Sequence, residues 1–220
     1  MLEAIKINRR VGELTLLKDV SLSVSTGQRL AVIGPSGSGK TLLLRSLARL
    51  DPIDSGEIRW RGELIRGHKT PKFRSRVVYL HQRPALIEGT VEDNLRLPFS
   101  LQIHRGKSFE RKVVLSLLKT LGRDETFLSK PQRVLSGGES QITALLRALI
   151  LDPDVLLLDE PTAAIDKDAT DSVEKLVAEW LAQRKNQQAI ILATHDLEQA
   201  RRVSDQILQM TEGSLVSEHD

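Results

Sequence analysis

The sequence contains no cysteine and few aromatic residues. Of its 220 residues, none is cysteine and 3% are Phe, Trp or Tyr. The lack of cysteine excludes disulfide bonds and thiolate metal ligands, and it fits a reducing compartment. The scarcity of aromatic side chains disfavours binding of single-stranded nucleic acid, because such proteins stack successive bases on several aromatic rings.

The sequence also lacks long apolar runs. None approaches the roughly 20 residues that a helix needs to span a bilayer, and Met1–Ile5 shows no signal-peptide pattern. We therefore expect that the chain does not form a membrane path by itself.

The charge excess is small. The formal net charge of +3 is too low to indicate a nucleic-acid partner, and none is expected. Basic residues gather between Arg61 and Arg76. A solvated surface is the simpler interpretation of this cluster, and contact with anionic lipid headgroups is the alternative.

Short, continuously apolar runs predict strands that are buried on both faces, as in a parallel sheet covered by helices. Apolar residues at helical spacing lie between these runs, for example from Ile142 to Ile150 and from Val173 to Leu181. Strands that alternate with helices predict a layered α/β fold. The predicted strands are Leu30–Ile33, Val77–Leu80, Val155–Leu158 and Ala189–Ala193.

Two further regions have other patterns. Alternating apolar residues predict an antiparallel β layer near the N-terminus, over Ile5–Ile7, Leu14–Val24, Glu57–Trp60 and Glu63–Ile65. The stretch from Val91 to Ile150 has no clear strand, and Phe109–Leu121 carries one apolar helical face. We therefore predict a single domain with a catalytic core over residues 1–86 plus 151–220 and a helical subdomain over 87–150.

A glycine-rich segment follows the first buried strand and matches the P-loop pattern. Its glycines let backbone N–H groups wrap phosphates, and the helix that follows presents its positive end to them. Lys40 can reach the outer phosphates, and the Thr41 hydroxyl can bind Mg²⁺. The segment, here called the phosphate loop, is Gly34, Pro35, Ser36, Gly37, Ser38, Gly39, Lys40 and Thr41.

Five later segments add candidate residues, and each alone has a plainer interpretation or is a weak signal. Leu135–Gln141 opens a helix, where Ser136 could simply be the N-cap. Asp159 and Glu160 follow the buried strand Val155–Leu158, as a polar strand end would. Gln82, Ala164–Asp166 and the lone His195 are each weak signals alone. A lone histidine after a strand is more often structural.

Taken together and in their order along the chain, the phosphate loop and these segments resemble the motifs of ABC transporter ATPases. The resemblance covers essentially the whole chain. The resemblance implies a P-loop NTPase fold with a RecA-like parallel core, an antiparallel β layer and a helical insertion. It implies ATP and Mg²⁺ as ligands, with Asp159, Thr41 and Gln82 at the metal. Glu160 would be the general base, and His195 and Gln82 would sense the γ-phosphate.

The same resemblance implies an assembly. Ser136, Gly137 and Gly138 would complete the site of a second copy in an ATP-bound homodimer, together with Asp166. The dimer would drive a separate integral membrane permease subunit from the cytoplasmic face of the inner membrane, as a peripheral protein. The alternatives are an ATPase that transmits force without transport, and a soluble ATPase that acts on DNA.

Two details refine the resemblance. Members of the family usually carry an aromatic residue near the N-terminus that stacks on adenine, whereas Asn8–Val11 has none, so selectivity for ATP over GTP is open. Arg9 or Arg10 could stack on the base instead. Gly89–Asn94 resembles a run of exporter ATPases, most like the Fet-type single-domain ATPases linked to iron or metal-stress export. Residues 83–99 would then dock the membrane subunit.

Overall fold

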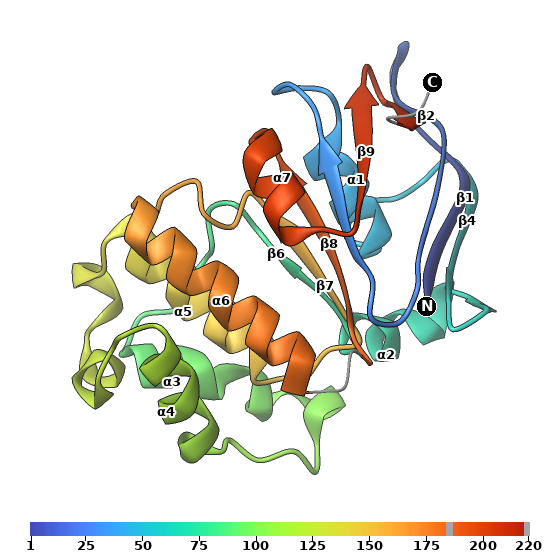
Figure 1. The fold of residues 1–220 in the computed structure, drawn as a ribbon. Coiled ribbons are helices and arrows are strands. Elements are labelled where there is room, and N and C mark those ends of the chain that lie inside the picture. The colour runs from blue at the N-terminus through green and yellow to red at the C-terminus, as the bar shows by residue number, and fades with distance from the viewer. Residues whose placement is uncertain (184–186, 218–220) are drawn as a thin grey trace.

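A six-stranded sheet forms the centre of the computed structural model, which describes residues 1–183 and 187–217 (Figure 1). Its strand order is β10-β9-β3-β8-β7-β6. All neighbouring pairs are parallel except β10 with β9. The strands are β3 (Arg29–Ile33), β6 (Val77–Leu80), β7 (Val155–Asp159), β8 (Ala189–Thr194), β9 (Gln206–Thr211) and β10 (Ser214–Ser217).

The four predicted apolar runs are β3, β6, β7 and β8, so the predicted parallel core is confirmed. β9 does not follow from the sequence pattern. Gln206 and Gln209 of this strand are exposed, and only Met210 is fully buried. A strand next to the edge of a sheet is only partly covered and needs few apolar residues. For this reason β9 contains no continuous apolar run that would predict it.

A second, antiparallel sheet lies along one side of the first. It contains β1 (Leu2–Val11), β2 (Leu14–Val24), β4 (Ser55–Trp60) and β5 (Glu63–Leu64), in the order β2-β1-β4-β5. Along β1, Leu2, Ala4 and Ile7 are buried between exposed or half-buried neighbours. The predicted alternation over Ile5–Ile7 is wrong in detail, because Ile5 is 39% exposed whereas Ile7 is buried. A register shift between Ala4 and Ile7 interrupts the period of two that a regular strand has. The predicted β layer itself is confirmed.

Seven α-helices fill the rest of the described residues. The predicted stretch without strands holds α3, α4 and α5, which gather with α6 on the side of the sheet away from β1 (Figure 1). Short 3₁₀ helices connect them over 97–100, 102–104, 125–129 and 132–134. The α-helices are α1 (Lys40–Leu47), α2 (Thr70–Arg74), α3 (Val91–Arg96), α4 (Arg111–Thr120), α5 (Gly137–Leu149), α6 (Lys167–Gln183) and α7 (Leu197–Val203).

Two apolar cores lie on the two faces of the central sheet. On β7, Leu157 belongs to the core shared with β1, β2 and α1, whereas Leu156 and Leu158 belong to the core shared with α4, α5 and α6. Because successive side chains of a strand point to opposite faces, continuous apolarity supplies both cores. The second core contains side chains of the predicted helical subdomain, residues 87–150, and of the predicted catalytic core. The division into these two parts stays a proposal.

Candidate functional site

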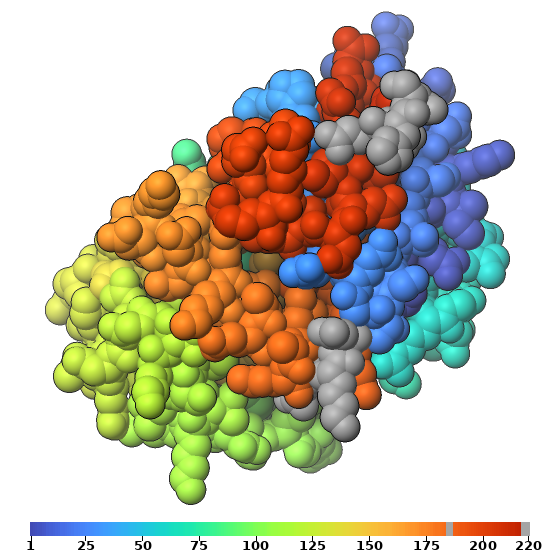
Figure 2. All heavy atoms as spheres, in the orientation of Figure 1, coloured from blue at the N-terminus to red at the C-terminus, as the bar shows by residue number. Residues whose placement is uncertain are grey.

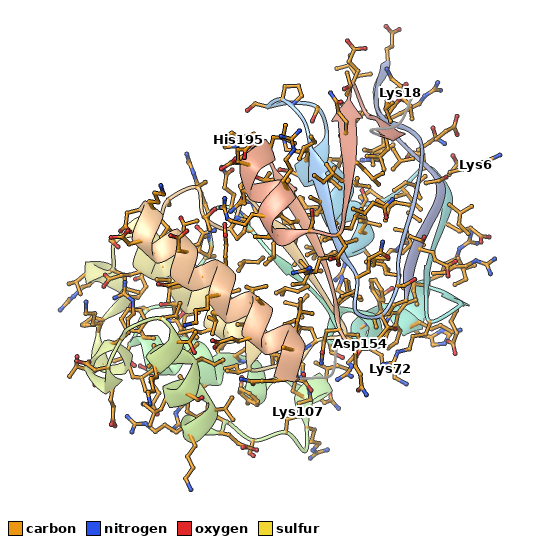
Figure 3. The ribbon with its side chains drawn as sticks, viewed as in Figure 1. Lys6, Lys18, Lys72, Lys107, Asp154 and His195 are labelled. Atoms are coloured by element: carbon orange, nitrogen blue, oxygen red, sulfur yellow. The ribbon has the colours of Figure 1, made fainter. Side chains whose placement is uncertain are left out.

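The candidate residues follow the carboxyl ends of four neighbouring parallel strands. The phosphate loop follows β3, Glu160 follows β7, Gln82 follows β6 and His195 follows β8. Parallel strands place these ends at one edge of the sheet, where ligands of open α/β sheets bind. Figure 3 shows His195 at this edge, whereas Asp154, which precedes β7, lies at the opposite edge.

The phosphate loop is pressed against β9. A Cβ atom on Gly34 would lie 2.2 Å from the carbonyl oxygen of Met210, and one on Gly39 would lie 2.9 Å from the Met210 side chain. Both glycines also have positive φ angles, of 155° and 109°. Backbone approach and backbone angle therefore each require glycine here. β9, which the sequence pattern did not predict, therefore requires glycine at Gly34 and Gly39.

Lys40 lies across the loop that precedes it. Its Nζ donates hydrogen bonds to the carbonyl oxygens of Gly34 at 2.7 Å and Pro35 at 3.0 Å. Burial lowers the pKa of Lys40, while the charges of Glu160 and Asp159 raise it. Ser38 Oγ is also buried, and it has no hydrogen-bond partner among the described residues. A buried ammonium and an unpaired buried hydroxyl in a glycine cradle fit phosphate oxygens.

Asp159 is held by two hydroxyl groups. Its Oδ1 accepts a hydrogen bond from Thr41 Oγ1 at 3.2 Å, and its Oδ2 accepts one from Tyr79 OH at 2.8 Å. Burial, followed by the hydrogen bond to Asp159, raises the pKa of Tyr79 far above its usual range, so the phenol stays a donor. Tyr79 is the sole tyrosine of the sequence, and the motifs do not point to it.

Glu160 joins three elements. Its Oε2 accepts a hydrogen bond from Gln82 Nε2 at 3.1 Å, and its Oε1 lies 3.2 Å from His195 Nδ1. Its backbone has a φ of 45°, and its N–H donates to the carbonyl oxygen of Ala193 at 2.9 Å. A non-glycine residue rarely adopts this left-handed conformation, and such strain clusters at functional sites. The structure thus brings the three predicted catalytic residues into contact.

A cavity of about 550 Å³ lies beside the phosphate loop. Lys40, Thr41, Gln82 and Glu160 line it, and so does Leu16 of β2. Arg9 and Arg10 do not line it. Arg9 forms an ion pair with Asp54 at 3.0 Å, and Arg10 Nε donates to Thr15 at 3.2 Å.

Ser136 is the N-cap of α5. Its Oγ accepts a hydrogen bond from the backbone N–H of Glu139, and the Glu139 side chain accepts one from the N–H of Ser136. The capping interpretation is therefore confirmed. Among the described residues, Ser136, Gly137 and Gly138 do not line the phosphate cavity. They lie against the segment that follows β7, because a Cβ on Gly138 would lie 3.1 Å from the carbonyl oxygen of Ala164.

Asp166 also has a local role. Its Oδ1 accepts a hydrogen bond from the N–H of Ala169 in the first turn of α6, at 2.9 Å. A carboxylate at this position satisfies an N–H group that the helix leaves unpaired and favours the positive end of the helix dipole. Asp166 is exposed, so its other oxygen is accessible to a second chain.

The oxygen atoms of Thr41, Asp159 and Gln82 could bind Mg²⁺ only if a bound substrate supplies further oxygen ligands. In the described part of the chain, no group of three or more His, Cys, Asp or Glu side chains could hold a metal ion. Thr41 and Asp159 provide a hydroxyl and a carboxylate that lie 3.2 Å apart, and Gln82 provides an amide. Mg²⁺ binds in this manner, through one or two protein oxygens together with substrate phosphates.

Comparisons with known proteins identify the family of the chain. Residues 17–163 match the family model described as ABC transporter. The chain belongs to the ABC transporter family. It is 37% identical to ABC transporter I family member 17 of Arabidopsis thaliana, over 91% of this chain and 74% of that protein. It is 33% identical to the tungstate uptake system ATP-binding protein TupC of Peptoclostridium acidaminophilum, over 94% of this chain and 92% of that one.

Solved structures of ABC proteins share the fold. The dimeric post-hydrolysis state of the ATP-binding cassette MJ0796, bound to ADP and Pi, superposes with a TM-score of 0.85 at 26% identity, over 98% of this chain and 96% of that one. The predicted α/β fold with its P-loop core is thereby confirmed. This ABC chain is an ATP-binding, ATP-hydrolysing domain, as predicted, and its hydrolysis is coupled to transport.

Proposed function

We propose that the chain hydrolyses ATP at the cavity beside the phosphate loop and thereby energises a transporter whose membrane path is a separate protein. The observation that carries the proposal is the contact of Glu160 with both Gln82 and His195 beside Lys40. Three strand ends supply these groups, so the cavity can hold a phosphate chain and place a base next to it.

In this proposal Glu160 removes a proton from the water that attacks the γ-phosphorus. Gln82 and His195 each hold one of its oxygens, at 3.1 and 3.2 Å, and so fix the direction of the carboxylate. Lys40 turns from the loop carbonyls to the outer phosphate oxygens, and Ser38 donates its unpaired hydroxyl. Thr41, Asp159 and Gln82 would hold Mg²⁺, which supplies neutralisation of the charge that develops on the phosphates.

We further propose that the site is completed by a second copy of the chain. Ser136 is exposed at the N-terminus of α5, where free N–H groups and the helix dipole favour an anion. It does not line the phosphate cavity of its own chain. A two-fold homodimer would place Ser136, Gly137 and Gly138 of one chain opposite the phosphate loop of the other, as the dimeric MJ0796 cassette supports.

An exposed apolar surface supports a membrane partner. Among the described residues, no helix is both long and apolar enough to cross a membrane. We propose an integral membrane permease subunit that docks on the predicted residues 83–99 and on the neighbouring residues 101–103. This would place the chain on the cytoplasmic face of the membrane. Ile87, Leu101 and Ile103 in this segment are 40%, 53% and 46% exposed. Large apolar side chains that are exposed to this extent suit contact with a partner protein.

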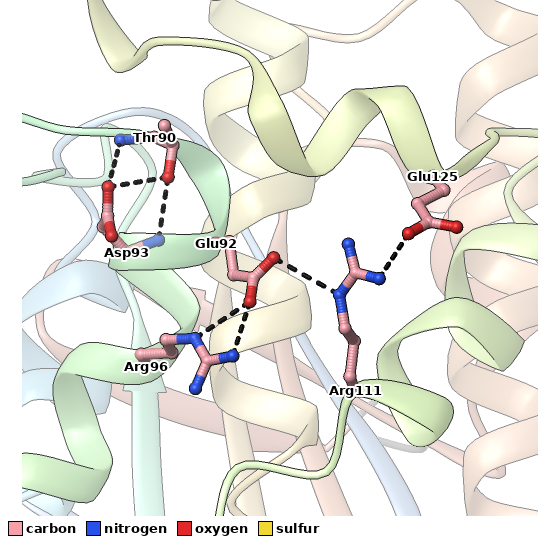
Figure 4. Close-up of polar contacts among 6 residues, drawn as sticks. All are labelled: Thr90, Glu92, Asp93, Arg96, Arg111 and Glu125. Carbon is pink, nitrogen blue, oxygen red and sulfur yellow. Dashed lines mark hydrogen bonds and ion pairs between the residues drawn. The ribbon is translucent and has the colours of Figure 1, made fainter.

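The start of α3 makes the segment rigid. Thr90 and Asp93 form a reciprocal capping box, and Glu92 binds Arg96 and Arg111 (Figure 4). Asn94 is fully buried and bonds both the N–H and the carbonyl oxygen of Ile87. These contacts fix the start of α3 and the backbone of Ile87.

Replacing Leu86 or Phe99 by Glu is expected to leave basal ATP hydrolysis unchanged and to abolish its coupling to the permease. Phe99 also packs edge-on against Phe109, with ring centroids 6.1 Å apart, so Leu101→Glu is the cleaner companion variant. Val113, 43% exposed on α4, provides the matched control Val113→Glu. Co-purification with the permease and transport in vesicles are measured. Variants that still bind the permease and support transport would contradict this docking surface.

The finer proposal, export of iron or another metal, rests on the resemblance of Gly89–Asn94 to exporter ATPases. The capping box and the buried Asn94 give the same run a local structural account. Import of an anion is the second candidate, because similar proteins are named for uptake of tungstate and import of sulfate or phosphate. ATP-driven efflux of iron from loaded vesicles supports export, whereas ATP-driven uptake of an oxyanion supports import.

A further inference from the structure

Gln199 is a buried amide on α7 to which none of the roles proposed above assigns a function. Its side chain is 4% exposed, and all of its side-chain hydrogen bonds lead to other elements. Its Oε1 accepts from Thr194 Oγ1 at 3.0 Å. Its Nε2 donates to Thr162 Oγ1 at 2.9 Å and to Glu174 Oε1 at 3.0 Å. A buried amide in which both heavy atoms are bonded is rigid and specifies its surroundings.

The partners of Gln199 flank the catalytic contact. Thr194 immediately precedes His195, and Thr162 follows Glu160 by two residues. A cavity of about 560 Å³ holds Glu160, His195 and Gln199 in its wall. A second cavity, of about 360 Å³ between α6 and α7, has Gln199 and Thr162 in its wall as well; Figure 2 shows a hollow between the orange residues of α6 and the red residues of α7. Cavities thus lie on two sides of Gln199, and its hydrogen bonds connect the segments that carry Glu160 and His195.

A charge fixes the orientation of the amide. Both oxygens of Glu174 accept from Arg202, at 2.8 Å each, and the side chain of Glu174 is 13% exposed. A carboxylate accepts hydrogen bonds and cannot donate them when ionised. The NH₂ group of Gln199 must therefore face Glu174 and Thr162, which leaves the carbonyl oxygen for the hydroxyl of Thr194.

We propose that Gln199 is a positioning residue for ATP hydrolysis. It ties Thr194, which precedes His195, to Thr162, two residues after Glu160, so that the 3.2 Å contact between Glu160 and His195 is kept. Glu174 and Arg202 anchor this tie to α6 and α7. The inference rests on the proposed role of Glu160 as the base.

The first test removes the amide and keeps its bulk. A displacement of about 1 Å can cost on the order of 10²-fold in rate, so Gln199→Leu is expected to lower kcat by roughly 10- to 100-fold. The KM for ATP should stay within about twofold, because Gln199 does not line the phosphate cavity. The control is Glu198→Gln on the same helix. The Glu198 side chain is 78% exposed, and this variant should keep the wild-type kcat.

The second test exchanges the amide and the carboxylate. Gln199→Glu places two carboxylates at the 3.0 Å contact with Glu174, and it should lower kcat as Gln199→Leu does. In the double variant Gln199→Glu/Glu174→Gln, the new amide donates and the new carboxylate accepts, so this contact is restored with its direction reversed, although Arg202 Nη2 loses the oxygen to which it donates in the wild type. Thr194 and Thr162 then donate to the new carboxylate. We expect the double variant to recover part of the kcat that Gln199→Glu loses.

Three outcomes would overturn the proposal: a wild-type kcat in Gln199→Leu, a loss of ATP affinity in proportion to kcat, or no recovery in the double variant. The Glu160→Gln variant, assayed alongside, separates this inference from the proposed function. If Glu160→Gln is inactive while Gln199→Leu is normal, only the role of Gln199 fails. If Glu160→Gln hydrolyses ATP normally, the proposed base fails whatever Gln199 does.

Discussion

Glu160→Gln is expected to bind ATP as the wild type does and to hydrolyse it at least about 10²-fold more slowly, because a positioned general base contributes roughly 10²- to 10⁴-fold. Glutamine keeps the size of the side chain and can still accept a hydrogen bond from Gln82, 3.1 Å away in the wild type. It cannot take the proton of the attacking water. Since the phosphate loop is untouched, ATP affinity should be preserved.

Phosphate release under single-turnover conditions and equilibrium binding of labelled ATP separate the two effects. Glu198→Gln, the same change at a side chain that is 78% exposed, controls for the change of charge and should behave as the wild type. Turnover close to the wild-type rate in Glu160→Gln would show that another group is the base.

Ser136→Arg is expected to abolish hydrolysis while the isolated chain still binds ATP. The proposed homodimer brings the start of α5 against the phosphate loop of the partner, where an arginine side chain has no room. Ser136 does not line its own phosphate cavity, so binding within one chain should persist. Lys40→Ala should do the opposite and lower ATP affinity itself, because it removes the buried ammonium beside the loop.

The substitution also removes an N-cap, which is worth about 1 kcal/mol of stability. Ser136→Ala loses the same hydrogen bond without adding bulk, so it isolates this effect. The thermal midpoints of both variants should fall by similar amounts, while only Ser136→Arg loses hydrolysis entirely. If Ser136→Arg weakens ATP binding in monomers as much as Lys40→Ala does, the site is not shared between chains.

The central sheet could be predicted because its signals are local and redundant. Each buried strand is a continuous apolar run, and the chemical residues follow these runs directly, as Glu160 follows β7. Parallel strands place such residues at one edge of a sheet. The prediction that Lys40, Glu160, Gln82 and His195 share a site comes from the resemblance of the motifs to those of ABC ATPases, and the parallel strands provide its physical reason.

Residues that act through tertiary contacts gave no such signal. Tyr79 binds Asp159 across the sheet and Leu16 enters the cavity from β2, but each looks like an ordinary apolar position in its strand. Gln199 reads as a polar residue of a surface helix, although it is 4% exposed. The burial of Gln199 depends on where α6 packs, and no spacing within α7 encodes that packing.

The homodimer with shared sites is the central claim, and the mass of the Glu160→Gln variant in solution tests it most directly. The chain has a mass of 24.5 kDa, so a dimer has twice that, 49.0 kDa. Light scattering with Mg²⁺ and ATP should give the dimer mass for Glu160→Gln and the monomer mass for Ser136→Arg/Glu160→Gln. With ADP, both should be monomers. A Glu160→Gln chain that stays monomeric with saturating ATP, or a double variant that dimerises equally well, would contradict the account.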